Sequence, residues 1–304
     1  MQGDKLAAEF GIRGVLDFAD TPGGLVKARI ACEGVEAELY LQGAQLTQWA
    51  RPAGRPVLFL SGRSAFAPGK AIRGGIPVIF PWFGPHPSNS GAAQHGFART
   101  APWRLQEAGH AQGDGVTLTL RLEPGAFVPG LWNDPVPVEY SLTIGQRLRL
   151  SLTVRNTAAQ EIAFEEALHT YFAVSDVTRA AVSGLEGCAF IDKTDHMQRK
   201  RAARTPLTLT GETDSIFLDT PDRLTLTDPG WGRQVTITKA NARSTIVWNP
   251  WREKAAAMAD LGEEAWRSMI CVETGNVADN AVRLRAGAVH TLSTVIEVGP
   301  TRAP

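Results

Sequence analysis

Two polar residues stand inside apolar, strand-like segments, where residue types that move protons are costly to bury. His169 lies in the middle of IAFEEALHTYFAVSD (162–176), and Glu273 directly follows the apolar run Met269–Val272. Histidine is the side chain most easily tuned to donate a proton near neutral pH, and an unpaired buried carboxylate is strongly destabilising. The two residues therefore form a candidate acid–base pair on neighbouring strands. The alternatives are a core histidine bonded to a carbonyl and an edge-strand glutamate in solvent.

Two arginines in glycine-containing segments are candidates for holding an anion. Arg73 precedes a glycine pair in AIRGGIPVIFPWFGPH (71–86), where prolines fix an aromatic-rich turn, and Arg99 lies in QHGFART (94–100). Glycine lets a ligand approach the backbone closely, and a guanidinium binds anions through charge-assisted hydrogen bonds. The pattern predicts a small anion site. The alternative for Arg73 is a surface position at the mouth of a loop.

The segment 94–100 holds two further hydrogen-bonding side chains, Gln94 and His95. If the segment is extended, His95, Phe97 and Arg99 share one face. The alternative for His95 is a hydrogen-bonded histidine of the core or of a loop.

Three tryptophans, Trp82, Trp248 and Trp251, lie in or near these segments. The apolar face of a sugar ring packs well on an aromatic side chain. Each tryptophan is a candidate sugar platform, with a place in the core as the alternative.

Several common chemistries lack their motifs. PGKAIRGG has alanine where a P-loop needs Ser or Thr, and no GxGxxG, HExxH or GxSxG motif occurs. The six histidines are scattered without metal-ligand spacing, and Cys32, Cys188 and Cys271 form no CxxC pair. Nucleotide, zinc-protease and serine-hydrolase chemistry are therefore disfavoured, and we expect reduced thiols in a cytoplasm.

The charge balance limits the partners. The 304 residues include 31 Lys+Arg and 31 Asp+Glu, whereas a nucleic-acid binder should show a basic excess. The chain lacks a run of about 18 apolar residues, the length that a membrane span needs. Its start, MQGDKLAAEFGIRG, has no apolar core like that of a signal peptide. We therefore expect a cytoplasmic protein, a monomer by default, that binds neither nucleic acid nor membrane.

Period-two alternation of apolar residues is the main signal for the elements that position these side chains. VTLTLRLE (116–123) and LRLSLTVR (148–155) alternate as antiparallel strands with one buried face do. Gly145, at the centre of VEYSLTIGQRLRLSLTV, predicts a hairpin. Further candidate strands are 37–42, 223–227, 234–239 and 291–298.

The segment around His169, read as one strand, separates its side chains onto two faces. Glu165, Ala167, His169 and Tyr171 fall on one side, and Glu166, Leu168, Thr170 and Phe172 on the other.

Helix is scarce, since only EKAAAMADLGEEAWRS (253–268) is a candidate and Gly262 interrupts it. No linker-like stretch and no repeat of fixed period occurs. The pattern predicts an all-β fold of two packed antiparallel sheets. We expect residues 1–304 to form a single domain, with the ends 1–15 and 299–304 at its periphery.

Six stretches, in their order along the chain, carry a resemblance to a known family. They are IRGGIPVIFPWFG, QHGFAR, LHTYFAVSD, DSIFL (214–218), VWNPW and CVE, and they span positions 72 to 273. The ordered set resembles the hexose-6-phosphate mutarotases (glucose-6-phosphate 1-epimerases) of the aldose 1-epimerase superfamily. The resemblance implies a galactose-mutarotase-like β-supersandwich, with the active site on the concave face of the larger sheet and no metal or organic cofactor.

The resemblance also assigns roles to individual positions. His169 of LHTYF matches the catalytic histidine and Glu273 of CVE the catalytic glutamate. The substrate-binding positions are matched by Arg73, Gln94, Arg99 and Asp214, with the arginines as phosphate contacts. His95 falls within the matched motif. The loop after PWFG, HPSNSGAAQ, is short and polar, so no ligand contact is carried over to it.

The implied activity is interconversion of the α and β anomers of a D-hexose 6-phosphate, glucose 6-phosphate first. One alternative is a mutarotase of unphosphorylated aldoses, against which the arginine pair argues. The other is a non-catalytic sugar-phosphate-binding protein on the same fold. A protein that only binds needs no proton-transfer pair, so the presence of both His169 and Glu273 argues against it.

Overall fold

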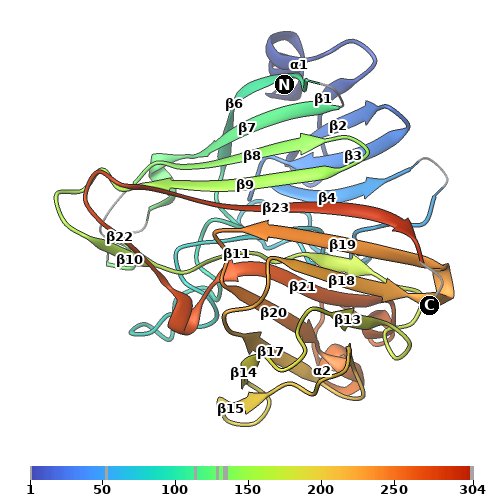
Figure 1. The fold of residues 1–304 in the computed structure, drawn as a ribbon. Coiled ribbons are helices and arrows are strands. Elements are labelled where there is room, and N and C mark those ends of the chain that lie inside the picture. The colour runs from blue at the N-terminus through green and yellow to red at the C-terminus, as the bar shows by residue number, and fades with distance from the viewer. Residues whose placement is uncertain (1, 52–53, 113–114, 128–129, 133–135, 302–304) are drawn as a thin grey trace.

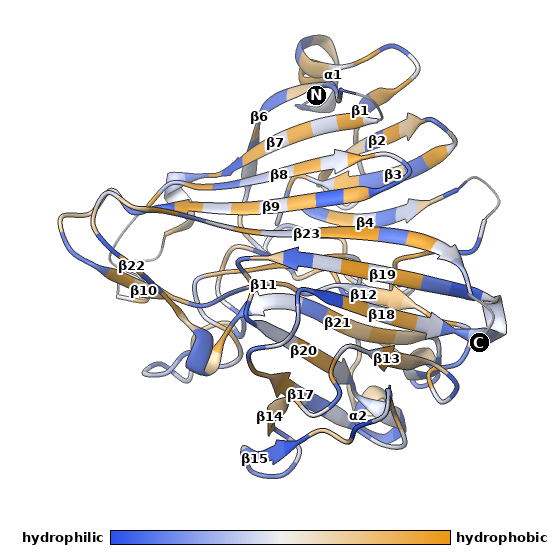
Figure 2. Ribbon diagram, in the orientation of Figure 1, coloured by the Kyte–Doolittle hydropathy of each residue, from blue (hydrophilic) through white to orange (hydrophobic). Residues whose placement is uncertain are grey.

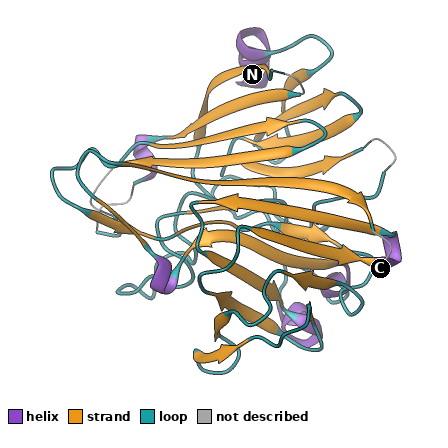
Figure 3. Cartoon of the chain, in the orientation of Figure 1, coloured by secondary structure: helices purple, strands orange, loops and turns teal. Residues whose placement is uncertain are grey.

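Strands make up most of the regular secondary structure, and the helices are short and lie at the ends of strands (Figure 3). The computed structural model describes residues 2–51, 54–112, 115–127, 130–132 and 136–301. Within these residues, no helix has the length and apolar character needed to cross a membrane.

A nine-stranded antiparallel sheet forms the longest ladder and runs across Figure 1 from top to bottom. Buried apolar residues alternate along its strands with more exposed polar ones, which gives the banded colouring of Figure 2. In spatial order the strands are β16 (Leu207–Thr208), β13 (Ala181–Ser183), β18 (Arg223–Asp228), β19 (Arg233–Ala240), β23 (Val289–Pro300), β9 (Leu148–Arg155), β8 (Val138–Ile144), β7 (Val116–Leu122) and β6 (Trp103–His110).

The strands predicted from alternation are confirmed. The candidates at 116–123, 148–155, 223–227, 234–239 and 291–298 correspond to β7, β9, β18, β19 and β23. The hairpin predicted at Gly145 joins β8 to β9.

Three further antiparallel sheets complete the fold. The eight-stranded sheet consists of β15 (Gln198–Arg201), β14 (Ala189–Asp192), β17 (Thr213–Phe217), β20 (Ser244–Asn249), β21 (Met269–Asn276), β11 (Glu166–Leu168) and β5 (Val78–Ile79), with β12 (Tyr171–Ala173) also paired to β21. The four-stranded sheet consists of β1 (Leu16–Asp20), β2 (Val26–Cys32), β3 (Val35–Tyr40) and β4 (Gln45–Ala50). The small sheet pairs β10 (Ile162–Phe164) with β22 (Val282–Leu284).

The sheets pack as two layers with the core between them. The nine-stranded sheet is one layer; the four-stranded and eight-stranded sheets form the other and meet at an isolated bridge between Leu46 and Ile76. One apolar cluster includes buried residues of all three sheets, such as Leu39, Leu150 and Val272. The predicted all-β, two-layer architecture is therefore confirmed.

The helices differ from the prediction. The helix candidate at 253–268, with its interruption at Gly262, is confirmed in part: α2 (Trp251–Ala257) stops where Met258 turns extended at φ −92° and ψ 101°. Gly262 then takes a left-handed φ of +96°, and the helical path resumes only in η3 (Ala265–Ser268). The sequence analysis did not predict α1 (Gln2–Phe10). Three short 3-10 turns complete the set: η1 (Pro124–Ala126), η2 (Pro229–Trp231) and η4 (Ala278–Asn280).

Candidate functional site

All seven residues singled out in the sequence line one pocket of about 180 Å³. They are Arg73, Gln94, His95, Arg99, His169, Asp214 and Glu273. The pocket lies on the face of the eight-stranded sheet that points away from the nine-stranded one, because Thr274, next to Glu273, points the opposite way and approaches Thr294 of β23 (3.5 Å between hydroxyls). The site was expected on the larger sheet. That expectation is wrong when sheets are ranked by their number of strands, because the pocket lies on the eight-stranded sheet and not on the nine-stranded one.

His169 and Glu273 are opposite each other across two strands. Leu168 pairs with Thr274 and Tyr171 with Cys271, so the same register, continued over the residues between, sets His169 against Glu273. Their side chains share the pocket face, with 3.3 Å between His169 Nδ1 and Glu273 Oε1. The predicted neighbouring-strand arrangement is therefore present.

Two details of the strands differ from the sequence analysis. β21 does not end at Glu273 but continues to Asn276, so this carboxylate lies mid-strand and is only 1% exposed. The segment 162–176 is not one strand but three short ones, β10, β11 and β12. The backbone N–H of His169 donates to Pro77 O (3.0 Å), in register with the pairing of β11 and β5.

Burial shifts the pKa of each residue in the direction that favours its neutral form. Desolvation, followed by the negative charge of Asp214, raises the pKa of Glu273 well above its usual range. Desolvation, followed by His95 and the cationic Arg99 and Arg73, lowers the pKa of His169 well below its usual range. Within the described residues, His169 Nδ1 and both Glu273 carboxylate oxygens make no hydrogen bond. Their polar atoms are thus available to a ligand.

Arg73 is held in place by its neighbours. Its Nε and Nη2 donate to Asp260 Oδ2 (3.1 and 2.9 Å), and its Nη1 donates to the hydroxyl of Tyr171 (3.1 Å). The glycine pair that follows is required by space, since a Cβ on Gly75 would lie 2.2 Å from the carbonyl oxygen of Leu46. The guanidinium is therefore fixed at the pocket wall.

The segment 94–100 is a turn and not an extended stretch, because His95 and Gly96 have φ of +66° and +70°. His95 and Arg99 consequently reach the pocket while Phe97 packs in the core. Arg99 Nη2 donates to the carbonyl oxygen of Gln94 (2.7 Å), and its buried Nε makes no hydrogen bond within the described residues.

His95 is an electrically neutral neighbour. Its Nδ1 accepts a hydrogen bond from the backbone N–H of Gly84 (3.2 Å). Desolvation, followed by the charges of Arg99 and Lys193, lowers its pKa well below the usual range. We infer that the ring presents Nε2–H as a donor.

Lys193 is a pocket residue that the sequence analysis missed. Its Nζ lies 2.9 Å from Asp214 Oδ2 and 5.3 Å from the ring centre of Phe83. It stands in a polar turn between β14 and β15, which in sequence looks like solvent-exposed loop.

Four other lining residues were missed as well: Phe83, Tyr171, Lys254 and Met258. Asp260, which holds Arg73, was also missed because it falls within the segment read as helix. A signal for Tyr171 did exist, since the strand reading put it on the same face as His169.

Of the three tryptophans, Trp248 alone is among the residues that line the pocket. Its ring centre lies 6.2 Å from that of His169, at an interplanar angle of 80°. Trp82 is buried in the core, and Trp251 packs on Trp266.

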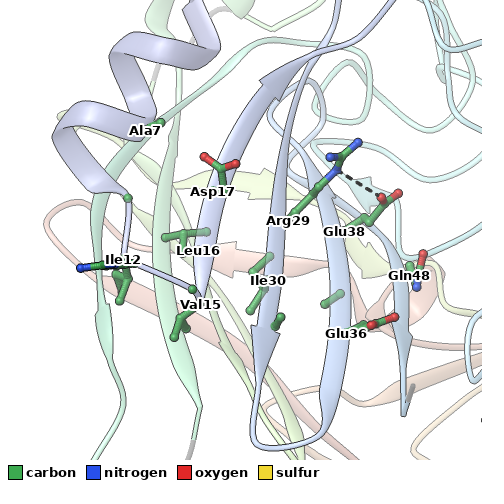
Figure 4. Close-up of a pocket in the computed structure, with 15 residues that line it drawn as sticks. Ala7, Ile12, Val15, Leu16, Asp17, Arg29, Ile30, Glu36, Glu38 and Gln48 are labelled. Carbon is green, nitrogen blue, oxygen red and sulfur yellow. Dashed lines mark ion pairs between the residues drawn. The ribbon is translucent and has the colours of Figure 1, made fainter. Parts of the chain in front are cut away.

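A larger hollow, of about 730 Å³, lies elsewhere, against α1 and the four-stranded sheet (Figure 4). Its polar lining includes Asp17, Arg29, Glu36 and Glu38, with a loose Arg29–Glu38 pair at 4.0 Å. It contains no histidine, so it offers no acid–base pair of the kind in the smaller pocket. Among the described residues, no group of three His, Cys, Asp or Glu side chains is arranged to hold a metal ion.

The family model for aldose 1-epimerase matches residues 27–297 of the chain, a stretch that includes every pocket residue named above. The chain belongs to the aldose 1-epimerase family. This aldose 1-epimerase homologue is accordingly an isomerase that acts on the anomeric carbon of a sugar.

The names of similar proteins agree with this family assignment. A protein of Cenchrus ciliaris named "Putative glucose-6-phosphate 1-epimerase" is 34% identical over 286 residues, covering 89% of this chain and 84% of its own. One of Escherichia coli (strain K12) with the same name is 32% identical, covering 86% of each chain. The crystal structure of a mutarotase homologue from Salmonella typhimurium superposes with a TM-score of 0.87 at 27% identity, over 99% of this chain and 100% of that one.

Proposed function

We propose that this epimerase interconverts the α and β anomers of a hexose 6-phosphate, with glucose 6-phosphate as its preferred substrate. The observation that carries the proposal is one pocket that joins the His169–Glu273 pair to two arginines. The names of the relatives from Cenchrus ciliaris and Escherichia coli support the choice of sugar phosphate.

The proposed mechanism needs only proton transfers. Glu273, as carboxylate, takes the proton of the anomeric hydroxyl, and His169, as imidazolium, donates a proton to the ring oxygen. The C1–O5 bond breaks and leaves an aldehyde, whose rotation about C1–C2 presents the other carbonyl face. Reclosure returns each proton to its donor. General acid–base catalysis of this kind supplies ~10²–10⁴-fold of rate acceleration.

The pair must hold one proton between its two members. Burial favours a protonated Glu273 and a neutral His169 in the free pocket. This state and the carboxylate–imidazolium state contain the same number of protons. A sugar hydroxyl that donates to the carboxylate stabilises its charged form. Substrate binding therefore favours the catalytic distribution.

In the proposal, Arg73 and Arg99 hold the 6-phosphate, and Gln94, His95 and Asp214 contact the sugar. The fixed guanidinium of Arg73 and the unbonded Nε of Arg99 support phosphate binding, because both can form charge-assisted hydrogen bonds. A phosphate held there orients C1 toward the acid–base pair.

We further propose that residues 1–304 act as a single domain and a monomer in the cytoplasm, with a small-molecule substrate and with neither nucleic acid nor membrane as partner. The neutral charge balance supports this setting. Proton transfer by two side chains requires no metal or organic cofactor.

Exchange NMR on equilibrated α- and β-glucose 6-phosphate tests the activity. We expect the parent protein to accelerate exchange, and His169→Ala and Glu273→Gln each to lower that acceleration by about 10²-fold or more. Variants that match the parent would remove both residues from the mechanism.

The same measurement on free glucose tests the phosphate role. Arg73→Ala combined with Arg99→Ala should abolish the preference for the phosphorylated sugar. An unchanged preference would reject the arginine assignment, and equal parental rates on both sugars would favour an aldose mutarotase. Binding of glucose 6-phosphate without any acceleration would favour a non-catalytic binding protein.

A further inference from the structure

Tyr171 contacts both functional parts of the pocket and has no role in the mechanism above. Its ring stacks on the His169 imidazole, with centroids 4.7 Å apart and planes 9° from parallel. Its hydroxyl accepts a hydrogen bond from Arg73 Nη1 (3.1 Å). The side chain is 2% exposed, so both contacts lie in a site shielded from water. One buried residue thus links the anion-binding side of the pocket to the acid.

The stacked ring favours the charged form of its neighbour. The face of an aromatic ring carries partial negative charge, which attracts a cation more than a neutral group. An imidazolium at His169 therefore gains more from the ring of Tyr171 than a neutral imidazole does.

The hydroxyl of Tyr171 fixes the orientation of Arg73. A guanidinium has five N–H donors, and here Asp260 takes two and Tyr171 takes one. The two remaining donors can face an anion. Burial raises the pKa of Tyr171, so the phenol stays neutral and acts here as an acceptor for Arg73.

Charged and titratable groups approach His169 from every element around it. Glu273 lies on β21, His95 and Arg99 on the turn 94–100, and Arg73 on the loop before β5. The two arginines disfavour a proton on His169. An anion bound between them offsets their charge and so favours protonation of the ring.

We propose that Tyr171 is a positioning residue that couples anion binding at Arg73 to proton loading of His169. Its hydroxyl sets the anion-binding donors of Arg73, and its ring stabilises the imidazolium that results. The inference rests on the proposed function: the 6-phosphate anchors the sugar and also helps to charge the acid. Inorganic phosphate should therefore speed the anomerisation of unphosphorylated glucose by the parent protein.

Two substitutions separate the two contacts. Tyr171→Phe keeps the ring and removes the hydroxyl, so we expect KM for glucose 6-phosphate to rise about fivefold with kcat nearly unchanged. Tyr171→Leu removes the ring as well, so we expect kcat to fall about tenfold. The basic limb of its kcat–pH profile should also move to lower pH, because the imidazolium is less stable. A merely structural role would make both variants lose kcat and melting temperature together.

The NMR titration of the His169 ring, with and without inorganic phosphate, tests the coupling without any turnover. We expect phosphate, at a concentration that half-saturates the parent, to raise the titration midpoint in the parent and to raise it less in Tyr171→Phe at the same concentration. An equal phosphate effect in both proteins would overturn the proposal, even if Tyr171→Leu fails to fold. If the parent does not accelerate exchange, the proposed function fails while this titration still decides the coupling.

Discussion

His169 and Glu273 are cross-strand neighbours, in register across β21 and the gap between β11 and β12, with 3.3 Å between Nδ1 and Oε1. Directly opposed residues of an antiparallel pair have closely spaced Cβ atoms, so the sheet ladder itself sets the separation of the two side chains. Neither carboxylate oxygen of Glu273 makes a hydrogen bond within the described residues. The ladder therefore holds the two side chains close together while the carboxylate oxygens keep unused acceptor capacity.

The burial of Glu273 should destabilise the fold at alkaline pH. The pKa of Glu273 is raised in the folded state. The folded protein therefore has its full stability below the ordinary carboxyl pKa and loses part of it as the pH rises through the raised pKa of Glu273. Glu273→Gln removes this ionisation. We expect it to raise Tm by about 2 °C or more at pH 8, and by less at pH 5, in thermal melts.

The control for this melt is Glu263→Gln, which changes an exposed glutamate. It should leave Tm unchanged at both pH values. An equal gain for Glu273→Gln at pH 5 and pH 8 would show that ionisation is not the cause.

Replacing Gly75, the second glycine after Arg73, should destabilise the fold. Gly75 has φ of +64°, and a Cβ there would lie 2.2 Å from Leu46 O, which already accepts the N–H of Ile76 (2.8 Å). Because the backbone must shift, we expect Gly75→Ala to lower Tm by about 5 °C or more and to reduce activity on glucose 6-phosphate.

Gly69→Ala is the matched control, since Gly69 has a similar φ of +73° with nothing within 4 Å of its Cβ position. It measures the conformational cost alone. If the two variants melt alike, close packing of the chain at Gly75 is not what requires glycine.

The sequence predicted much of this pocket face because the candidate residues lie in local patterns. Alternation over one segment put His169 and Tyr171 on the same side, and the structure stacks them. The long strands were predictable for the same reason, since each buries one face and exposes the other. All seven candidate residues, of which Asp214 came only from the family resemblance, line one pocket.

The parts that escaped prediction depend on contacts between distant segments. The Arg73–Asp260 pair spans 187 positions, and no periodicity encodes it. Lys193 sits in a polar turn, and only its approach to Asp214 brings it into the pocket. The interruption of the strand around His169 is instead local, because the N–H of Thr170 bonds to Leu168 O (2.9 Å) in a turn that a period-two pattern does not reveal.

Lys193 should help Glu273 to ionise. Its positive charge lowers the pKa of Glu273, opposing the larger effects of burial and Asp214. Lys193→Met should therefore raise that pKa further, so the carboxylate forms only at higher pH. We expect the basic limb of the kcat/KM profile to move to higher pH, because that profile reports the free enzyme, in which Glu273 has the higher pKa of the pair. Lys200→Met, at an ion-paired lysine of strand β15, should leave the limb in place.

Asp214 should have the opposite effect on the same limb. Its negative charge, after burial, is the largest cause of the raised pKa of Glu273. Asp214→Asn removes that charge while keeping the size of the side chain, so the Glu273 pKa falls and the basic limb of kcat/KM should move to lower pH. Glucose 6-phosphate exchange measured by NMR from pH 5 to pH 9 gives both profiles. Shifts of Lys193→Met and Asp214→Asn in the same direction would mean that this limb does not report Glu273.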